Sequence, residues 1–179
     1  KNIFVDEKGE DSALFRNFIG GLQRYVPEAV ILFGPYVNSY RRFTRYLAAP
    51  INVQWGYDNR TVGLRVPASD AENRRVENRI PGADVNPYLA IATSLACGYL
   101  GLVEGLKPTE PLKTSAYAQR QGLVRDMYAA LDLMEACKPL HAVLGEDFVK
   151  LYCAIKRVEY EAFFQVISPW EREHLLLNV

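Results

Sequence analysis

The first pattern along the chain is an apolar stripe at helical spacing, which follows a polar turn at residues 7–11. Its members recur three or four positions apart. They are Leu14, Phe15, Phe18, Ile19, Leu22 and Tyr25. Residues at this spacing share one face of a helix. The pattern therefore predicts an amphipathic helix that begins at Ser12 and ends before Pro27.

Shorter segments between residues 51 and 80 have the spacing of strands. Residues 51–57 and 61–66 read as strands around the turn Asp58-Asn59. A third strand is expected at about 74–80, before a loop rich in proline and glycine. The sequence therefore predicts a short antiparallel sheet.

The third predicted strand alternates charged and uncharged residues. Since alternate side chains share a strand face, Arg75, Glu77 and Arg79 would lie together. A carboxylate between two arginines can ligate a divalent cation while its neighbours hold anions. The alternative is a solvated face with weak ion pairs. Trp55 and Tyr57 alternate on the first strand and either line a pocket beside this site or belong to the core.

The second half of the chain is mainly helical in pattern. Asn86 is suited to cap a helix with Pro87 in its first position, and this helix continues to about Glu104. Residues 105–123 contain two prolines and two glycines and should be mostly loop. Further helices are expected at 124–137, 139–144, 146–167 and 169–175. The fold class is α+β, a short antiparallel sheet packed with helices.

Length and charge restrict the function. A chain of 179 residues suits one domain. The formal net charge is zero, so no overall field recruits nucleic acid or a membrane surface. No secretory signal and no apolar run of spanning length is present. Cys97, Cys137 and Cys153 lack metal-ligand spacing and are expected to be buried free thiols in a cytoplasmic protein.

The basic residues are unevenly distributed. The segment from residue 41 to residue 79 holds eight arginines, four acidic residues and no lysine. The arginines are Arg41, Arg42, Arg45, Arg60, Arg65, Arg74, Arg75 and Arg79. Guanidinium makes forked contacts to carboxylate or phosphate that ammonium cannot make. The bias therefore indicates a localised anion site.

Several motifs in this region resemble the catalytic core of the glutamine synthetase family. They are Asn59-Arg60-Thr61-Val62-Gly63-Leu64-Arg65-Val66-Pro67, Asn73-Arg74-Arg75-Val76-Glu77-Asn78-Arg79 and Asn86-Pro87-Tyr88-Leu89, and residues 38–42 resemble the segment that precedes them. Their order and spacing match together, and the similarity extends over the whole chain. Residues 49–56 and 168–173 resemble the branch that makes γ-glutamylpolyamines such as γ-glutamylputrescine.

The resemblance implies an ATP-dependent carbon–nitrogen ligase. In this family ATP converts the γ-carboxylate of glutamate to an acyl phosphate, from which an amine displaces phosphate, and Mg²⁺ or Mn²⁺ assists. Arg41 and Arg45 are near alternatives for the residue at Arg42, and a salt bridge to Glu77 is the alternative role for Arg79. The implied roles are Glu77 for the metal, Arg65 and Arg75 for the ATP phosphates, Arg60 for the transferred phosphoryl group as the catalytic arginine, and Arg42 and Arg79 for the carboxylates of glutamate.

One departure from the family concerns the acceptor amine. Members that use ammonia carry a glutamate on a loop where this chain has Ala48. An apolar residue there removes a carboxylate that would stabilise ammonium, which favours putrescine or another polyamine. An ordinary glutamine synthetase that uses ammonia and a non-catalytic paralogue are the alternatives.

A second departure is length. The resemblance implies that residues 1–179 are the C-terminal portion of the catalytic domain, and that the other metal ligands and a small N-terminal domain lie upstream. The chain alone is therefore expected to be inactive. The full-length protein is expected to form a homo-oligomer, such as the dodecamer of two rings known in the family, with no nucleic-acid or membrane partner.

Overall fold

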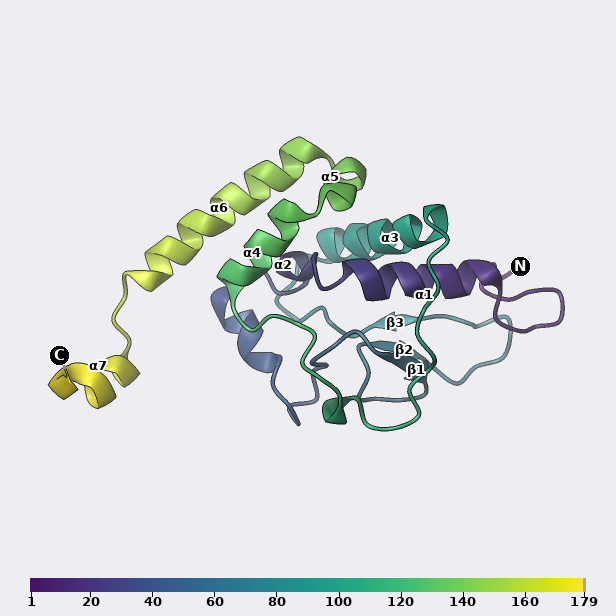
Figure 1. The fold of residues 1–179 in the computed structure, drawn as a ribbon, viewed down its shortest axis with the longest axis horizontal. Coiled ribbons are helices and arrows are strands. Elements are labelled where there is room, and N and C mark those ends of the chain that lie inside the picture. The colour runs from purple at the N-terminus through teal and green to yellow at the C-terminus, as the bar shows by residue number, and fades with distance from the viewer. Residues whose placement is uncertain (179) are drawn as a thin grey trace.

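The computed structural model describes residues 1–178, in which helices cover one face of a small sheet (Figure 1). The α-helices are α1 (Ala13–Tyr25), α2 (Val30–Phe33), α3 (Pro87–Val103), α4 (Met127–Ala136), α5 (Lys138–Leu144), α6 (Glu146–Phe164) and α7 (Pro169–Leu175). Short 3₁₀ helices are η1 (Val37–Arg42), η2 (Ala116–Ala118) and η3 (Leu176–Asn178). The strands are β1 (Trp55–Tyr57), β2 (Leu64–Val66) and β3 (Glu77–Asn78).

Helices α1 and α3 begin at the residues that the sequence predicts. The Ser12 hydroxyl accepts a hydrogen bond from the backbone N–H of Phe15, 3.1 Å away, at the start of α1. The Asn86 side chain accepts from the N–H groups of Tyr88 and Leu89, and Pro87 occupies the first helical position of α3. Side-chain caps satisfy backbone donors that a helix start leaves unpaired.

Helices α1 and α3 pack closely because glycines face each other. A Cβ atom added to Gly21 would lie 2.2 Å from the carbonyl oxygen of Cys97, and one on Gly101 would lie 2.2 Å from that of Asn17. Both helices then lie over the same face of the sheet (Figure 1). The small residues seen in the sequence therefore bring two helix backbones together.

The sheet is mixed, so the prediction of an antiparallel sheet is wrong for its first pair. Strands β1 and β2 are parallel, with Trp55 beside Leu64, whereas β2 and β3 are antiparallel. Residues 58–63 lead the chain from the end of β1 back to the level of its first residue, so that β2 runs in the same direction as β1. The side chain of Asn59 anchors this connection, because its Nδ2 donates to the carbonyls of Leu112 and Thr114. A tight hairpin turn would have given antiparallel pairing.

The two faces of the sheet differ in character. On the face under the helices, Leu64 and Val66 are buried, and the Asn78 side chain donates to the Ser94 hydroxyl of α3 over 3.1 Å. Arg65 and Glu77 are partners in adjacent strands and alternate with these residues, so they point to the other face, which we call the arginine face. The alternation predicted for the third strand is confirmed at Glu77 and Asn78.

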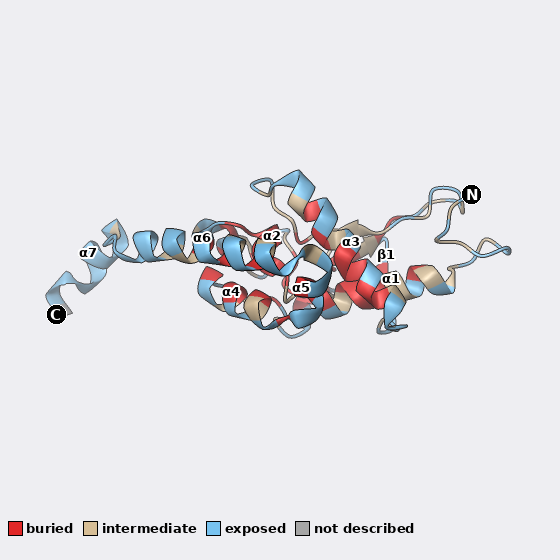
Figure 2. Ribbon diagram, turned by 90° about the horizontal axis from the view of Figure 1, so that it is seen from above, coloured by how far each residue is buried: buried red, intermediate tan, exposed pale blue. Residues whose placement is uncertain are grey.

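The helices of the C-terminal half agree with the predicted segments, and η2 is the one helical turn of the described 105–123 connection. Helix α6 packs on α4 and then extends beyond the core to α7, where the chain is exposed on every side (Figure 2). All three cysteines are free and buried, as predicted. Burial raises the pKa of the Cys137 thiol to about 12 and that of Cys153 to about 11. Among residues 1–178, none of the helices has the length and apolar character needed to cross a bilayer.

Candidate active site on the arginine face of the sheet

The centre of the site is an arginine held between two carboxylates. Arg65 Nη1 lies 3.1 Å from each carboxylate oxygen of Glu77, and its Nη2 donates to Asp58. The hydrogen bond from Arg65 lowers the pKa of the Asp58 carboxyl, and the same bond is the main reason that the pKa of Arg65 is raised. The Arg65 side chain is 17% exposed, and its Nε is buried without a partner. The fork is thus fixed in orientation and still has an unused donor.

Arg79 connects two loops at the edge of this face. Its Nη1 donates to the carbonyls of Arg60 and of Val62, the latter 3.0 Å away, and its Nη2 lies 3.3 Å from the carbonyl of Ala48. The alternative of a salt bridge to Glu77 is wrong, since no such pair forms between these two described residues. Arg79 therefore places Ala48 and Arg60 next to each other, although they are distant in sequence.

Two further arginines of the matched motifs are exposed. No side-chain hydrogen bond or ion pair of Arg60 is found among residues 1–178, although its charge also lowers the pKa of Asp58. Arg75 donates only to the carbonyl of Asn73, 3.0 Å away. Their guanidinium forks are thus available to an anion in solvent.

Arg42 is neither free nor a surface charge. Its Nη2 donates to the carbonyls of Phe33, 3.3 Å away, and Ile80, and its guanidinium lies 4.5 Å from the ring centre of Phe43. Burial lowers the pKa of Arg42, and its Nε is buried without a partner. The two alternatives to Arg42 in the sequence differ from it. Arg41 is exposed, and the Arg45 Nη2 lies 3.5 Å from the carbonyl of Gln119.

The loop that carries Ala48 has an unusual backbone. Tyr46 and Ala48 have positive φ values of 67° and 63°, a region that costs free energy for residues other than glycine. Arg79 holds the carbonyl of Ala48, and the Tyr117 hydroxyl lies 3.2 Å from that of Ala49. The side chains of Tyr46 and Leu47, which belong to this loop, are exposed.

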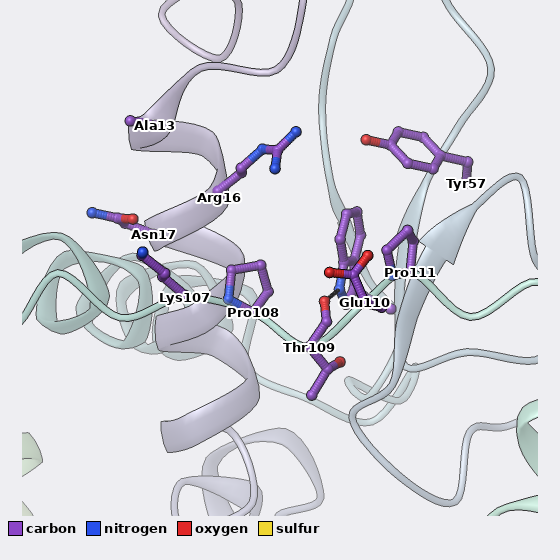
Figure 3. Close-up of a pocket in the computed structure, with 10 residues that line it drawn as sticks. Ala13, Arg16, Asn17, Tyr57, Lys107, Pro108, Thr109, Glu110 and Pro111 are labelled. Atoms are coloured by element: carbon purple, nitrogen blue, oxygen red, sulfur yellow. Dashed lines mark hydrogen bonds between the residues drawn. The ribbon is translucent and has the colours of Figure 1, made fainter.

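The aromatic residues Trp55 and Tyr57 do not line this site. They pair with Leu64 and Val66, so they lie on the opposite face of the sheet, where they border a separate pocket beside α1 (Figure 3). Sequence reasoning missed Asp11, whose side chain is 4% exposed and accepts from both the Tyr57 hydroxyl and Arg74. Nothing in the local sequence around Asp11 signals these distant partners.

Residues 1–178 do not hold a complete metal site by themselves. Within residues 1–178 no three His, Cys, Asp or Glu side chains converge as a metal cluster. Glu77 can supply one carboxylate, and it is paired with Arg65. A divalent cation needs more oxygen ligands than this. The described donor set therefore fits an anion and supplies one carboxylate, that of Glu77, out of the several oxygen ligands that a cation would need.

Comparison with known proteins assigns this fold to a class of protein. The family model of the glutamine synthetase catalytic domain matches residues 1–175, and the chain belongs to this family. It is 37% identical to gamma-glutamylputrescine synthetase PuuA of Escherichia coli K12, over 99% of the chain and 38% of that protein. It is 35% identical to type-1 glutamine synthetase 2 of Dictyostelium discoideum, over 98% of the chain and 35% of that protein.

A solved structure agrees with the fold. The apo structure of GmaS without ligand superimposes with a TM-score of 0.86 at 28% identity, covering 98% of this chain and 41% of that one. The chain thus spans about two fifths of the length of the proteins it matches.

Proposed function

We propose that the protein is an ATP-dependent ligase that joins the γ-carboxylate of glutamate to an amine. The observation that carries the proposal is the pairing of Arg65 with Glu77 on one face of the sheet, together with the hold of Arg79 on the loop of Arg60, in motifs that match the family in order. ATP would transfer its γ-phosphoryl group to glutamate, giving γ-glutamyl phosphate and ADP. The amine nitrogen would then attack the carbonyl carbon of this acyl phosphate, expel phosphate and lose a proton.

The arginines are suited to the first of these steps. We assign Arg65 and Arg75 to the ATP phosphates and Arg60 to the transferred phosphoryl group, because a guanidinium fork matches two phosphate oxygens. Preorganised cations stabilise charge that develops in a transition state. Asp58 and Glu77 fix the orientation of Arg65 before any nucleotide binds. Glu77 would also supply one ligand to Mg²⁺ or Mn²⁺, which neutralises phosphate charge when bound.

Glutamate is assigned to Arg79 and Arg42, with different supporting evidence. Arg79 lies at the junction of the Ala48 and Arg60 loops, so a carboxylate there would be next to the phosphoryl-binding arginine. Arg42 already donates to two carbonyls and is half-buried. Its Nε is buried without a partner, so the assignment of Arg42 to glutamate is supported by its place in the matched motifs.

For the acceptor we propose putrescine or another polyamine rather than ammonia. Ala48 is exposed, and no acidic side chain occurs in its loop, residues 43–50. The exposed Tyr46 ring, 5.4 Å from the ring of Tyr117, offers an aromatic face to an alkylammonium group. Relatives named for putrescine and for glutamine formation are similarly close to this chain, so the acceptor has to be tested directly.

The test is phosphate release by the full-length protein with putrescine and ammonia in competition. Putrescine should be preferred, and Ala48→Glu should lower the preference about tenfold, because the new side chain fills the approach of a four-carbon amine and one packing contact is worth about 1.4 kcal/mol. Ala142→Glu on the exposed side of α5 is the control. Preference for ammonia would assign the protein as a glutamine synthetase, and no glutamate-dependent phosphate release would contradict the ligase proposal.

A further inference from the structure

The pocket beside α1 lies on the face of the sheet opposite the arginines. It has a volume of about 480 Å³ and lies between α1, β1 and the segment 107–111 (Figure 3). Small-molecule sites in proteins commonly have volumes of a few hundred Å³. Because Arg65 and Glu77 point away from this face, the cavity is separate from the candidate active site.

The wall formed by residues 107–111 is held in place by hydrogen bonds to neighbouring elements. The Thr109 N–H donates to the side chain of Gln23 over 2.9 Å, and Trp55 Nε1 donates to the Thr109 carbonyl over 2.6 Å. The Leu112 N–H donates to the Trp55 carbonyl over 2.7 Å. Pro108 and Pro111 restrict the same segment. The pocket is therefore formed without a ligand.

The ring of Tyr57 borders the pocket from β1 and is fixed at its far end. Its hydroxyl donates to Asp11, whose side chain is buried and also accepts from Arg74. The Tyr57 residue is still 49% exposed, so one side of the ring is available to a ligand. An immobilised aromatic face can bind a cation or an apolar group at low entropic cost.

Two side chains of opposite charge, those of Arg16 and Glu110, line the pocket and form no ion pair with each other. Arg16 projects from α1 and Glu110 from the facing segment, and Figure 3 shows both at the cavity, whereas Lys107 is directed toward Asn17. Neither Arg16 nor Glu110 makes a side-chain hydrogen bond or ion pair with another residue in the range 1–178. An arginine and a carboxylate that share one cavity and remain apart leave room for a molecule that carries the complementary charges.

We propose that this pocket binds a small zwitterion, namely a free α-amino acid. Its carboxylate would accept two hydrogen bonds from the guanidinium group of Arg16. Its ammonium group would lie against the carboxylate of Glu110 and the ring face of Tyr57. Its side chain would pack on Pro108 and Pro111. A simple anion would leave Glu110 facing it unfavourably, and a simple cation would do the same with Arg16. The pocket is independent of the ligase proposal, because none of its residues belongs to the arginine face.

Calorimetric titration of the 179-residue chain with L-phenylalanine, followed by the other common L-amino acids, tests the proposal. Binding should weaken at least tenfold in Arg16→Gln and in Glu110→Gln. It should weaken similarly for the N-acetyl derivative of the best amino acid, which lacks the ammonium charge, and for its amide, which lacks the carboxylate. Arg172→Gln and Glu173→Gln on the exposed helix α7 are matched controls that should bind normally.

Three results would overturn the proposal. One is no heat of binding with any amino acid to protein whose circular dichroism shows native helix content. Another is equal binding of the N-acetyl derivative, which would indicate a simple anion site. The third is unchanged binding to the Arg16→Gln, Glu110→Gln double variant, which would place the ligand elsewhere. Each readout is binding, so it does not depend on whether the full-length protein has ligase activity.

Discussion

The arginines between residues 41 and 79 act in two different ways. Arg42 and Arg79 donate to backbone carbonyls and hold segments together, whereas Arg60 and Arg75 extend into solvent. Arg65 is intermediate, because it is fixed by two carboxylates and retains a free donor. Substitutions in the first group should therefore affect stability and activity together, and those in the second group activity alone.

Arg60→Lys should not be conservative. Lysine keeps the charge and loses the fork, so the turnover rate of the full-length protein should fall about tenfold or more while KM for glutamate changes less. The fold should be unaffected, because no described residue hydrogen-bonds to the Arg60 side chain. Steady-state kinetics with glutamate varied would check this. A raised KM with unchanged turnover would instead assign Arg60 to the glutamate carboxylates.

Glu77→Ala should separate catalysis from stability. Turnover should be abolished, since a metal ligand is worth several kcal/mol of transition-state stabilisation. The free energy of unfolding should fall by less than about 1 kcal/mol, because the pair with Arg65 is partly exposed and Asp58 still holds Arg65. Activity and urea unfolding are measured on the same preparation.

The control for Glu77→Ala is Glu146→Ala. It removes the ion pair with Lys150, which is more exposed than the pair of Glu77 with Arg65 and lies far from the arginine face. Its turnover should equal that of the wild type. Wild-type turnover in folded Glu77→Ala protein would refute the metal role.

At the scale of elements, the contact between α1 and α3 supports the sheet. Gly21 and Gly101 let the helix backbones touch, and Gly98 lies against the ring of Phe18. Glycine in a helix usually costs about 1 kcal/mol relative to alanine. Its use at three positions of this contact is therefore compensated by close packing.

Gly101→Ala should destabilise the protein by about 1–3 kcal/mol, despite the better helix propensity of alanine. The new Cβ would lie 2.2 Å from the carbonyl oxygen of Asn17 and 2.5 Å from the Cα of Gly21, so one helix must move. Urea unfolding followed by circular dichroism measures the change. Ala92→Ser adds one atom at an exposed position of α3 and should be nearly neutral. Equal stability of the two variants would show that the helices separate without cost.

At the scale of the whole molecule, the described chain forms a core and a sheet face that carries arginines. The helices bury one face of the sheet, and the arginine face carries fixed and free guanidinium groups. The described part of the chain brings no cluster of metal ligands to this face. The relatives are more than twice as long, so catalysis is a property proposed for the full-length protein.

The 179-residue chain alone should release no glutamate-dependent phosphate from ATP, with or without Mg²⁺ or Mn²⁺. One carboxylate cannot fix the cations that phosphoryl transfer requires. The full-length protein assayed in parallel should be active under the same conditions. Metal-dependent turnover by the short chain, purified free of contaminating ligase, would show that Glu77 and the arginines suffice.

The sequence by itself determined the helices, the α+β class and the alternation around Glu77. The caps at Ser12 and Asn86 and the helical stripes depend on residues a few positions apart, so local pattern was enough. The motifs between residues 38 and 89 likewise identified the family before any geometry was known.

Only the tertiary structure decided the pairing and the partners. The parallel pairing of β1 with β2 depends on how Asn59 docks against residues 112 and 114, more than fifty positions away. Asp11 meets Tyr57 across 46 positions, and Arg79 meets Ala48 across 31. Such contacts are set by the packing of whole elements. The alternation in the sequence predicts which residues share a strand face. The tertiary structure determines which elements each face contacts.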